Sequence, residues 1–401
     1  MVKIWKLKRI ILLLVTCLVP FDAFGAAFLI YNQDAKATGM GMAVVSSIDN
    51  ASAVFYNPAL LVDQKGFGFS AGDIMIWPEM RHEDSATGKR TYTKATSHHV
   101  PNGYAKYTNG NFSFGIGIYS PFGLSTEWPA GWPGRYLTTF AEIKTTYINP
   151  VVAYRVNDRI SVAGGVSYVI SSIKLKNAIN LGFLGLPDGA AKLSGDGDGV
   201  NFNLAATAKL PMNYTISATY RSPTTIKYDG RASFSLPAPL ASSSTGASAT
   251  LTLPFLAVAG IAKQIGSLTL EGDVLYTGWS SMSSYRVTSD NGSANSFFYK
   301  NWFNTPSIAL GANYQWNKFL EVRAGYMYDR TPVPRTTLSP ELPDSTRHIY
   351  TAGLSFHKDS LKFHLGYQAT IFNDVKSYNQ ALGGTYNSVA HLVFLGLSYN
   401  Q

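Results

Sequence analysis

The alternation of apolar and polar residues in the last hundred positions constrains the fold of this 401-residue chain more than any other feature. In the stretch 320–329, Leu320, Val322 and Tyr326 fall on one face of an extended strand. Glu321 and Arg323 fall on the other face. A soluble β-sandwich would turn the polar face to water and bury the apolar one. An outer-membrane barrel would turn the apolar face to lipid and the polar face to its lumen.

Stretches with this two-residue period follow one another from Gly66 to the end of the chain. We count fourteen, and single-chain bacterial outer-membrane barrels have an even number of strands. Short turns and long gaps alternate between them, as expected of a barrel with both chain ends in the periplasm. A soluble sandwich gives no reason for such regularity. The sequence therefore predicts an all-β fold, a 14-stranded antiparallel transmembrane β-barrel over residues 66–401.

The boundaries of these stretches allow the prediction to be checked. Strands are expected near 66–77, 91–107, 112–120, 140–154, 160–176, 200–210, 214–228, 249–263, 267–288, 301–315, 318–330, 345–356, 361–373 and 388–400. Short turns are expected at 109–110, 157–158, 211–213, 265–266, 316–317 and 357–359. Two of the long gaps, 177–199 and 229–248, carry apolar residues that are discussed below.

Residues 1–25 have the pattern of a secretory signal peptide. A basic start with Lys3 is followed by an apolar run, Ile10 to Val19, which is too short to cross a bilayer as a helix. Small residues precede a cleavage site near Ala26. Cys17, the single cysteine of the sequence, lies in this segment, so the mature chain is expected to lack disulfides and thiolate metal sites. A lipoprotein cleavage at Cys17 is an alternative that its flanking residues fit poorly.

Residues 26–65 do not alternate and are rich in small side chains. Asn57 can cap a helix and Pro58, followed by Ala59, suits its first position, which needs no N–H group. We interpret this segment as a compact hatch of short helices. A 14-stranded barrel has a lumen too wide for its own side chains to fill. The hatch has the size and the place to plug it.

Motifs along the whole mature chain resemble those of the FadL-type long-chain fatty acid and aromatic hydrocarbon outer-membrane transporter family. They are Gly39-Met40-Gly41, Phe55-Tyr56-Asn57-Pro58-Ala59-Leu60, Ser120 to Trp128, Tyr220-Arg221-Ser222, Thr277-Gly278-Trp279-Ser280 and Asp329 to Pro334, in family order. The resemblance implies a barrel plugged by the N-terminal hatch. It further implies that hydrophobic ligands are captured outside and leave sideways into the bilayer beside a kinked strand.

Apolar residues in the two long gaps indicate a capture site, because exposed apolar patches usually mark binding. In the family these loops form a surface groove, and a simple loop cap is the alternative. The candidate substrate-binding residues are Leu181, Phe183, Leu184, Leu186, Phe234 and Leu236. Three basic residues, Arg135, Lys174 and Arg347, can pair with a carboxylate headgroup. An internal ion pair with Glu321 is the expected role of Arg323.

The third strand, 112–120, is the candidate lateral gate. Gly115 and Gly117 fall on its inward face, and glycine within a strand often marks a bulge or bend. Pro121, just after the strand, cannot donate to a hydrogen-bond ladder. By resemblance this is the kinked strand beside the lateral opening. The alternative is that both glycines make room for the hatch.

No residue pattern nominates a nucleophile with its base, so no enzyme activity, catalytic residue, metal or cofactor is expected. The adjacent His98 and His99 are interpreted as flanking a strand near the rim. The chain has a formal charge of +9 but no basic run, which argues against nucleic acid. Expected partners are outer-membrane lipid, the barrel-insertion machinery and a hydrophobic small molecule. The chain ends on Asn400-Gln401, although barrels read by that machinery usually end on an aromatic residue.

The predicted function is uptake of hydrophobic compounds, above all long-chain fatty acids, by a monomeric multi-pass channel of the bacterial outer membrane. An aromatic hydrocarbon channel for toluene-like compounds is the first alternative, and basic residues lining the inner pocket would distinguish the two. A surface anchor or adhesin barrel without transport and an outer-membrane lipid hydrolase are further alternatives.

Overall fold

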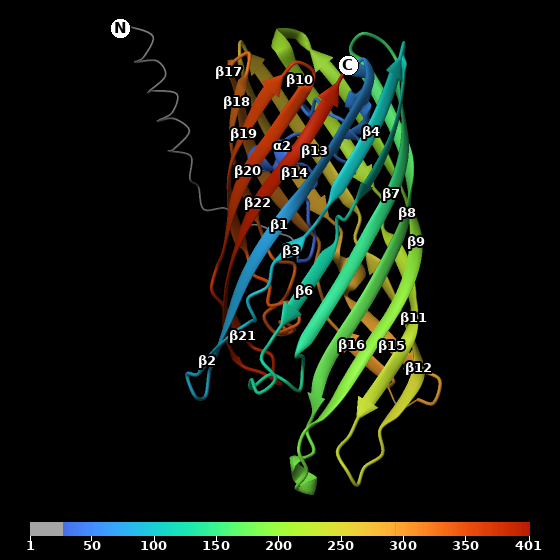
Figure 1. The fold of residues 1–401 in the computed structure, drawn as a ribbon, viewed down its shortest axis with the longest axis vertical. Coiled ribbons are helices and arrows are strands. Elements are labelled where there is room, and N and C mark those ends of the chain that lie inside the picture. The colour runs from blue at the N-terminus through green and yellow to red at the C-terminus, as the bar shows by residue number, and fades with distance from the viewer. Residues whose placement is uncertain (1–26, 293) are drawn as a thin grey trace.

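The computed structural model of the chain describes residues 27–292 and 294–401. The predicted signal peptide, residues 1–25, and its cleavage near Ala26 lie outside the described residues. The described chain forms a closed antiparallel barrel of 14 staves, which confirms the predicted fold (Figure 1). The first strand, β1 (Gly66–Asp84), pairs with the last, β22 (Gly384–Asn400), and closes the wall. Within the described residues, helices are all too short or too polar to span a bilayer.

Each stave, meaning one crossing of the wall, consists of one strand or of a few strands separated by a break. In chain order the staves are β1; β2 (Arg90–Tyr92), β3 (His98–His99) and β4 (Asn102–Asn109); β5 (Phe112–Tyr119) and β6 (Gly123–Glu127); β7 (Phe140–Arg155); β8 (Ile160–Ile179); β9 (Gly189–Leu210); β10 (Tyr214–Arg221) and β11 (Thr224–Ser235); β12 (Ser243–Leu253) and β13 (Leu256–Ile265); β14 (Leu268–Thr277) and β15 (Ser284–Ser289); β16 (Ser296–Tyr299) and β17 (Thr305–Asn317); β18 (Leu320–Asp329); β19 (Arg347–Lys358); β20 (Leu361–Phe372) and β21 (Val375–Ser377); and β22.

The two ends of the barrel differ. The six predicted short turns all lie between consecutive staves at the short-turn end, uppermost in Figure 1, where the C-terminus also lies. The long connections lie at the opposite, long-loop end. Several of them are shorter than predicted. In the two that carry the apolar residues, β8 and β9 pair as far as Ile179 and Gly189, and β11 and β12 as far as Phe234 and Ser243. The loops proper are therefore only 180–188 and 236–242.

The outer face carries the apolar set of each strand. On β8 and β9 the exposed side chains are Ile160, Val162, Val166, Tyr168 and Ile170, then Val200, Phe202 and Leu204. On β18 the expected polar set, Glu321, Arg323 and Asp329, is buried inside. Around the hatch, the alternation in the sequence is therefore explained by lipid outside and a polar lumen inside.

Residues 27–65 lie inside the barrel and are almost entirely buried. They form α2 (Ala35–Gly39), α3 (Ala53–Tyr56) and the 3₁₀ helix η1 (Pro58–Asp63). Asp34 caps α2 by accepting the N–H of Ala37 at 2.9 Å. Asn57 caps η1 in the same way, accepting the N–H of Ala59 at 3.0 Å. Local capping thus folds a segment that has too few residues to form a core of its own.

Polar groups of the wall hold this hatch in place. The Asn57 side-chain amide donates to Thr207 of β9 at 2.8 Å. Lys36 of α2 lies 2.6 Å from Asp49 and 3.4 Å from Glu321 of β18. Glu321 also pairs with Arg323, as expected from the sequence. The short-turn half of the lumen is therefore filled by the hatch and by buried ion pairs.

Candidate functional site

The barrel wall is interrupted between β5 and β6. Tyr119 at the end of β5 pairs with Tyr147 of β7, and pairing resumes with Gly123 opposite Lys144. Among the described strands, β6 pairs only with β7. At its end the carbonyl of Glu127 also accepts the N–H of Lys94, from the connection between β2 and β3, at 2.8 Å. The break coincides with Pro121, which has no N–H to offer to a ladder.

The first described residues of the hatch cover this break from inside. Leu29 forms an isolated antiparallel bridge with Phe122. The N–H of Ile30 donates to the carbonyl of Pro121 at 2.8 Å, and the N–H of Gly123 donates to that of Phe28 at 3.1 Å. The hatch therefore supplies, over three residues, the strand pairing that the wall lacks at this point.

A cavity of about 590 Å³ passes through the interrupted wall. Its lining includes lumen residues such as Phe28, Ile349 and Gln368. It also includes Lys144, which shares the outward face of β7 with the exposed Val152 and whose own side chain is 69% exposed. Because one cavity is lined from both sides of the wall, it forms a path from lumen to outer face.

None of the three predicted gate residues, Gly115, Gly117 and Pro121, lines this cavity. A Cβ atom at Gly115 would lie 2.7 Å from Val54 of the hatch, and one at Gly117 would lie 2.7 Å from Tyr104. Both glycines thus face inward as predicted, and they make room for the hatch and its neighbours, which was the alternative interpretation. Pro121 sits at the break itself. The opening lies at residues 120–125 rather than at the glycines.

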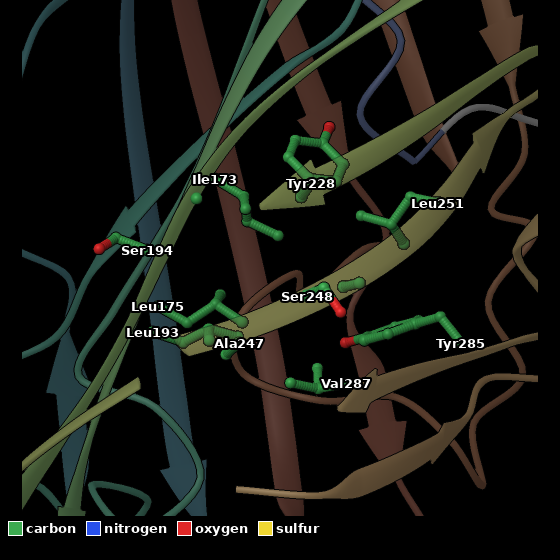
Figure 2. A pocket seen from close by; sticks show the side chains of 12 residues that line it. Ile173, Leu175, Leu193, Ser194, Tyr228, Ala247, Ser248, Leu251, Tyr285 and Val287 are labelled. Carbon is green, nitrogen blue, oxygen red and sulfur yellow. The ribbon is translucent and has the colours of Figure 1, made fainter. Parts of the chain in front are cut away.

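A second, narrower cavity lies in the lumen toward the long-loop end (Figure 2). Side chains from β8, β9, β11, β12 and β15 converge on it, and nearly all are apolar. The labelled ones include Ile173, Leu175, Leu193, Tyr228, Leu251 and Val287. The expectation of a polar lumen is wrong for this half, because no hatch reaches it there and the inward side chains pack against one another. The cavity has a volume of only about 20 Å³, so what the lumen offers here is a nonpolar wall rather than a preformed binding chamber.

The six candidate capture residues separate into three groups. Phe183 and Leu184 form an exposed loop tip, with 79% and 52% of their surface accessible. Leu181 is buried and lies with Leu236 against Gly189, so the two loops touch. Leu186 is half-buried in the same loop. Phe234 belongs to β11 rather than to a loop, and packs on the lumen cluster of Ala232, Ala247 and Val287.

The three candidate basic residues do not come together. The Nε atom of Arg135 donates to Asp188 at 2.7 Å and its guanidinium stacks on Tyr136, at the rim. Lys174 lies on the outer face of β8 and is 3.6 Å from Glu142, so it does not line the lumen. Arg347 does line the wall-crossing cavity, with its Nε atom 2.8 Å from Asp329.

Asp344, in the loop that precedes β19, lines the same cavity as Arg347. Burial raises the pKa of its carboxyl to about 7, against the opposing attraction of Arg347. This part of the cavity can therefore change its charge near neutral pH.

Sequence reasoning missed Arg221 and misplaced His98 and His99. Arg221 is buried between the rings of Phe55 and Tyr119, 5.3 and 5.4 Å from their centroids. Among the described residues no carboxylate lies within ion-pair distance of it, and Ser167 accepts its Nη1 at 3.2 Å. The two histidines form β3 inside the wall rather than flanking a strand at the rim. Alternation could have placed them on opposite faces, but not beside a cavity.

Metal binding finds no support in residues 27–292 and 294–401, where no three His, Cys, Asp or Glu side chains gather closely enough to hold an ion.

Comparisons with known proteins agree with this architecture. A family model described as "Outer membrane protein transport protein (OMPP1/FadL/TodX)" matches residues 16–400. A long-chain fatty acid transport protein of Salmonella typhi is 26% identical over 378 residues, covering 86% of this chain and 87% of that protein. Outer membrane protein P1 of Haemophilus influenzae is 24% identical over 455 residues, covering 98% and 99%.

Two solved structures share the fold. A Pseudomonas aeruginosa FadL homologue superposes with a TM-score of 0.84 at 20% identity, covering 94% of this chain and 100% of that one. The Pseudomonas putida toluene transporter TodX superposes with a TM-score of 0.76 at 17% identity, covering 95% and 99%.

Proposed function

Because the chain belongs to the outer membrane protein transport protein family (OMPP1/FadL/TodX), we propose that it imports hydrophobic compounds, foremost long-chain fatty acids, and releases them sideways into the membrane. As an outer-membrane β-barrel of many crossings, it faces lipid all round its wall. We place the long-loop end outside the cell and the short-turn end in the periplasm, as is usual for such barrels.

The observation that carries this proposal is the cavity lined from both sides of the wall. Each buried CH₂ group gains about 0.8 kcal/mol on leaving water, so a long acyl chain resists a hydrated exit. The direct way to the periplasm is filled by the hatch and the buried ion pairs around Lys36 and Glu321. Release through the wall keeps the chain in nonpolar surroundings.

We propose a route of three stages. The loop tip with Phe183 and Leu184 meets the substrate first, and Leu181, Leu186 and Leu236 offer apolar surface behind it. The acyl chain then moves along the apolar lumen wall around the narrow cavity, with Phe234 beside it. The substrate finally passes Arg347 and leaves between β6 and β3. Asn57, Pro58 and Ala59 keep the hatch seated, and Gly115 and Gly117 give it room beside Pro121.

A headgroup with negative charge is favoured over a neutral ring, because Arg347 and His98 line the wall-crossing cavity, where Lys144 is already paired with Glu142 at 2.8 Å. Aromatic hydrocarbon uptake is the second candidate, because the apolar lumen would also accept toluene and a toluene transporter shares the fold. An anchor without transport would have no use for a passage through the wall. The family is one of transport proteins, and we propose that this member, too, has no catalytic activity and works as a monomer.

The test compares labelled oleate and toluene uptake in a strain that lacks the gene and carries it on a plasmid. Ser125→Trp places a large ring in the wall-crossing cavity, and Thr225→Trp places the same ring on the outer face of β11 as the matched control. We expect oleate uptake that needs the protein, falls with Ser125→Trp and persists with Thr225→Trp. If only toluene uptake required the protein, the function would be that of an aromatic hydrocarbon channel. If neither oleate nor toluene uptake required the protein, although the barrel was inserted in the outer membrane, the transport proposal would be refuted.

A further inference from the structure

The two histidines of β3 place an imidazole on each side of the barrel wall. His98 pairs with Ile76 of β1 and His99 with Met75. Ile76 packs on the inner cluster around Val100, so His98 shares the lumen face. The side chain of His99, on the opposite face, is 58% exposed. Both residues line the cavity that crosses the wall.

On the outer face His99 is tied to an acidic residue that lipid does not favour. Its Nδ1 atom lies 2.6 Å from Oδ2 of Asp73. Asp73 lies on the outward face of β1 and opposite Leu395 of β22, within the apolar band. Ionisable groups in such a band are costly and usually serve a function. The hydrogen bond to Asp73 fixes the ring and leaves Nε2 with no hydrogen-bond partner among the described residues.

On the lumen side His98 continues a series of polar groups along the cavity. Its Nε2 atom lies 3.1 Å from Oγ1 of Thr96, and its side chain is half-buried. Arg347 marks the inner end of the same cavity and Lys144 its outer end. A carboxyl group moving outward would therefore meet Arg347, His98 and His99 in the cavity lining, where the one carboxylate of β7, Glu142, is paired with Lys144 at 2.8 Å.

A fatty acid needs such groups because its two ends behave differently. The acyl chain gains by moving between apolar surfaces, whereas the headgroup loses hydrogen bonds wherever none are offered. Imidazole nitrogens can donate to a carboxylate or accept from a carboxylic acid, so they serve either protonation state. A neutral hydrocarbon would not need them.

Resting on the proposed function, we propose that His98 and His99 form a two-sided relay that passes the acidic headgroup of a long-chain carboxylic acid through the barrel wall. His98 receives the headgroup from the lumen. His99, oriented by Asp73, receives it at the outer face and releases it into the surrounding lipid.

A merely structural role for the pair makes a different prediction. If the histidines only keep β3 against β1, their loss should widen or close the opening for every substrate alike. If they bind headgroups, their loss should affect acids and spare hydrocarbons of equal length. The ratio of the two uptake rates separates the roles.

The experiment uses His98→Phe/His99→Phe, which keeps ring size and removes the nitrogens. The matched control is His391→Phe, another outward histidine, which lies 2.6 Å from the Tyr367 hydroxyl and does not line the cavity. Uptake of labelled palmitate and of hexadecane is measured for each. We expect palmitate uptake to fall roughly tenfold in the double variant, as for one lost hydrogen bond to a charged group, with hexadecane unchanged. The control should match the wild type for both.

Equal losses for both compounds, or no loss for palmitate, would overturn the relay. These outcomes differ from failure of the proposed function, in which the wild type itself would import neither compound. As a direct readout, the ¹⁵N signals of the His99 ring, assigned with the single His99→Phe variant, should shift when palmitate is added to the protein in nanodiscs. They should stay in place with hexadecane, and a palmitate titration that leaves them unmoved would also overturn the relay.

Discussion

Asp273 of β14 accepts the backbone N–H of Val44 in the hatch, at 2.9 Å from its Oδ2 atom. The same oxygen accepts the N–H of Val45 at 3.1 Å. Two positions earlier on the strand, Glu271 accepts the N–H of Ser46 at 2.5 Å. Two inward carboxylates thus bind three successive amides of a segment that has no secondary structure to satisfy them. Amides buried here without an acceptor would bear their full desolvation cost, so this contact latches the hatch.

Replacing Asp273 by Asn should loosen the hatch without unfolding the barrel. The amide keeps the size of the side chain but has one acceptor oxygen and an NH₂ group in place of two carboxyl oxygens, so the contact to the two N–H groups weakens, a loss of about 1–3 kcal/mol. We expect higher conductance to small ions in planar bilayers and faster entry of polar dyes into liposomes. The control is Asp229→Asn on the exposed face of β11. Unchanged conductance in Asp273→Asn would show that other contacts suffice to seat the hatch.

The Asn57 side chain joins three parts of the molecule, and its replacement by Ala should release all of them. It accepts from Ala59, donates to the Val45 carbonyl at 2.6 Å and donates to Thr207 at 2.8 Å. Losing the cap alone costs about 1 kcal/mol, and the buried partners left unpaired add to this. Hydrogen exchange of amides in residues 44–62 should accelerate, while amides of β8 and β9 stay protected. Thr207→Val, which removes only one of the three bonds, should give a smaller effect. Equal hydrogen exchange of residues 44–62 in Asn57→Ala and Thr207→Val would contradict this order of effects.

Gly115→Val and Ser125→Trp should produce opposite defects. A side chain at Gly115 would push against Val54 and Leu61 of the hatch, so polar solutes should leak through the lumen. Ser125→Trp fills the wall-crossing cavity, so lateral release should stop while the hatch stays closed. Dye leakage and oleate uptake, measured on the same two preparations, check this. If oleate uptake fell in Gly115→Val without dye leakage, the lateral gate would lie at Gly115 rather than at the break in the wall.

Sequence alternation gave the barrel and most of its strands, because lipid outside and hatch inside impose opposite chemistry on alternate residues. The alternation does not predict the structure where the chemical difference between the outer and inner faces of the wall disappears. The outward residues of β9 near Asp196 are polar, since they extend past the lipid band, and so the strand was taken for a loop. On the inner face, the lumen near Tyr228 is apolar because the hatch does not reach that half of the barrel.

The site was less accessible to sequence reasoning because it depends on residues that meet across the lumen. Counting from Ile170 by twos already puts Lys174 on the lipid face, so its placement could have been foreseen. Nothing local to Arg221 reveals that Phe55 of the hatch will stack on it. Likewise, the position of His98 beside an opening depends on where β6 ends, which only the assembled wall determines.

The Arg135–Asp188 contact should hold the capture loop in position at neutral pH. The hydrogen bond from Arg135 keeps the pKa of the Asp188 carboxyl below its ordinary value. An acid with a lowered pKa in the folded state contributes stability above its unfolded pKa, and this is lost as the pH falls through the folded value. Hydrogen exchange of residues 181–186 should therefore rise in the wild type only below about pH 4. In Arg135→Ala it should already be fast at pH 7.

A second exposed pair provides the control for the capture loop. Arg90→Ala breaks the Arg90–Glu83 contact of 2.7 Å in a different hairpin of the long-loop end, between β1 and β2, and should leave residues 181–186 unaffected. Phe183 and Leu184 have no other ionic anchor near them in the described chain, so a loop that stays protected in Arg135→Ala would show that the packing of Leu181 on Leu236 suffices.

Asp344 should make headgroup binding depend on pH near neutrality. Its pKa is raised to about 7 by burial, so the folded state holds a proton that the unfolded state has released, between about pH 4 and 7. Stability therefore falls as the pH rises through this window. The charge that appears above pH 7 offsets the positive field of Arg347 in the same cavity. A fixed-charge probe, hexadecanesulfonate, should bind more tightly at pH 6 than at pH 8, by roughly fivefold or about 1 kcal/mol. Because the probe does not titrate, Asp344→Asn should flatten the profile at the high-affinity level; a profile that persists in this variant would assign the titration to another group.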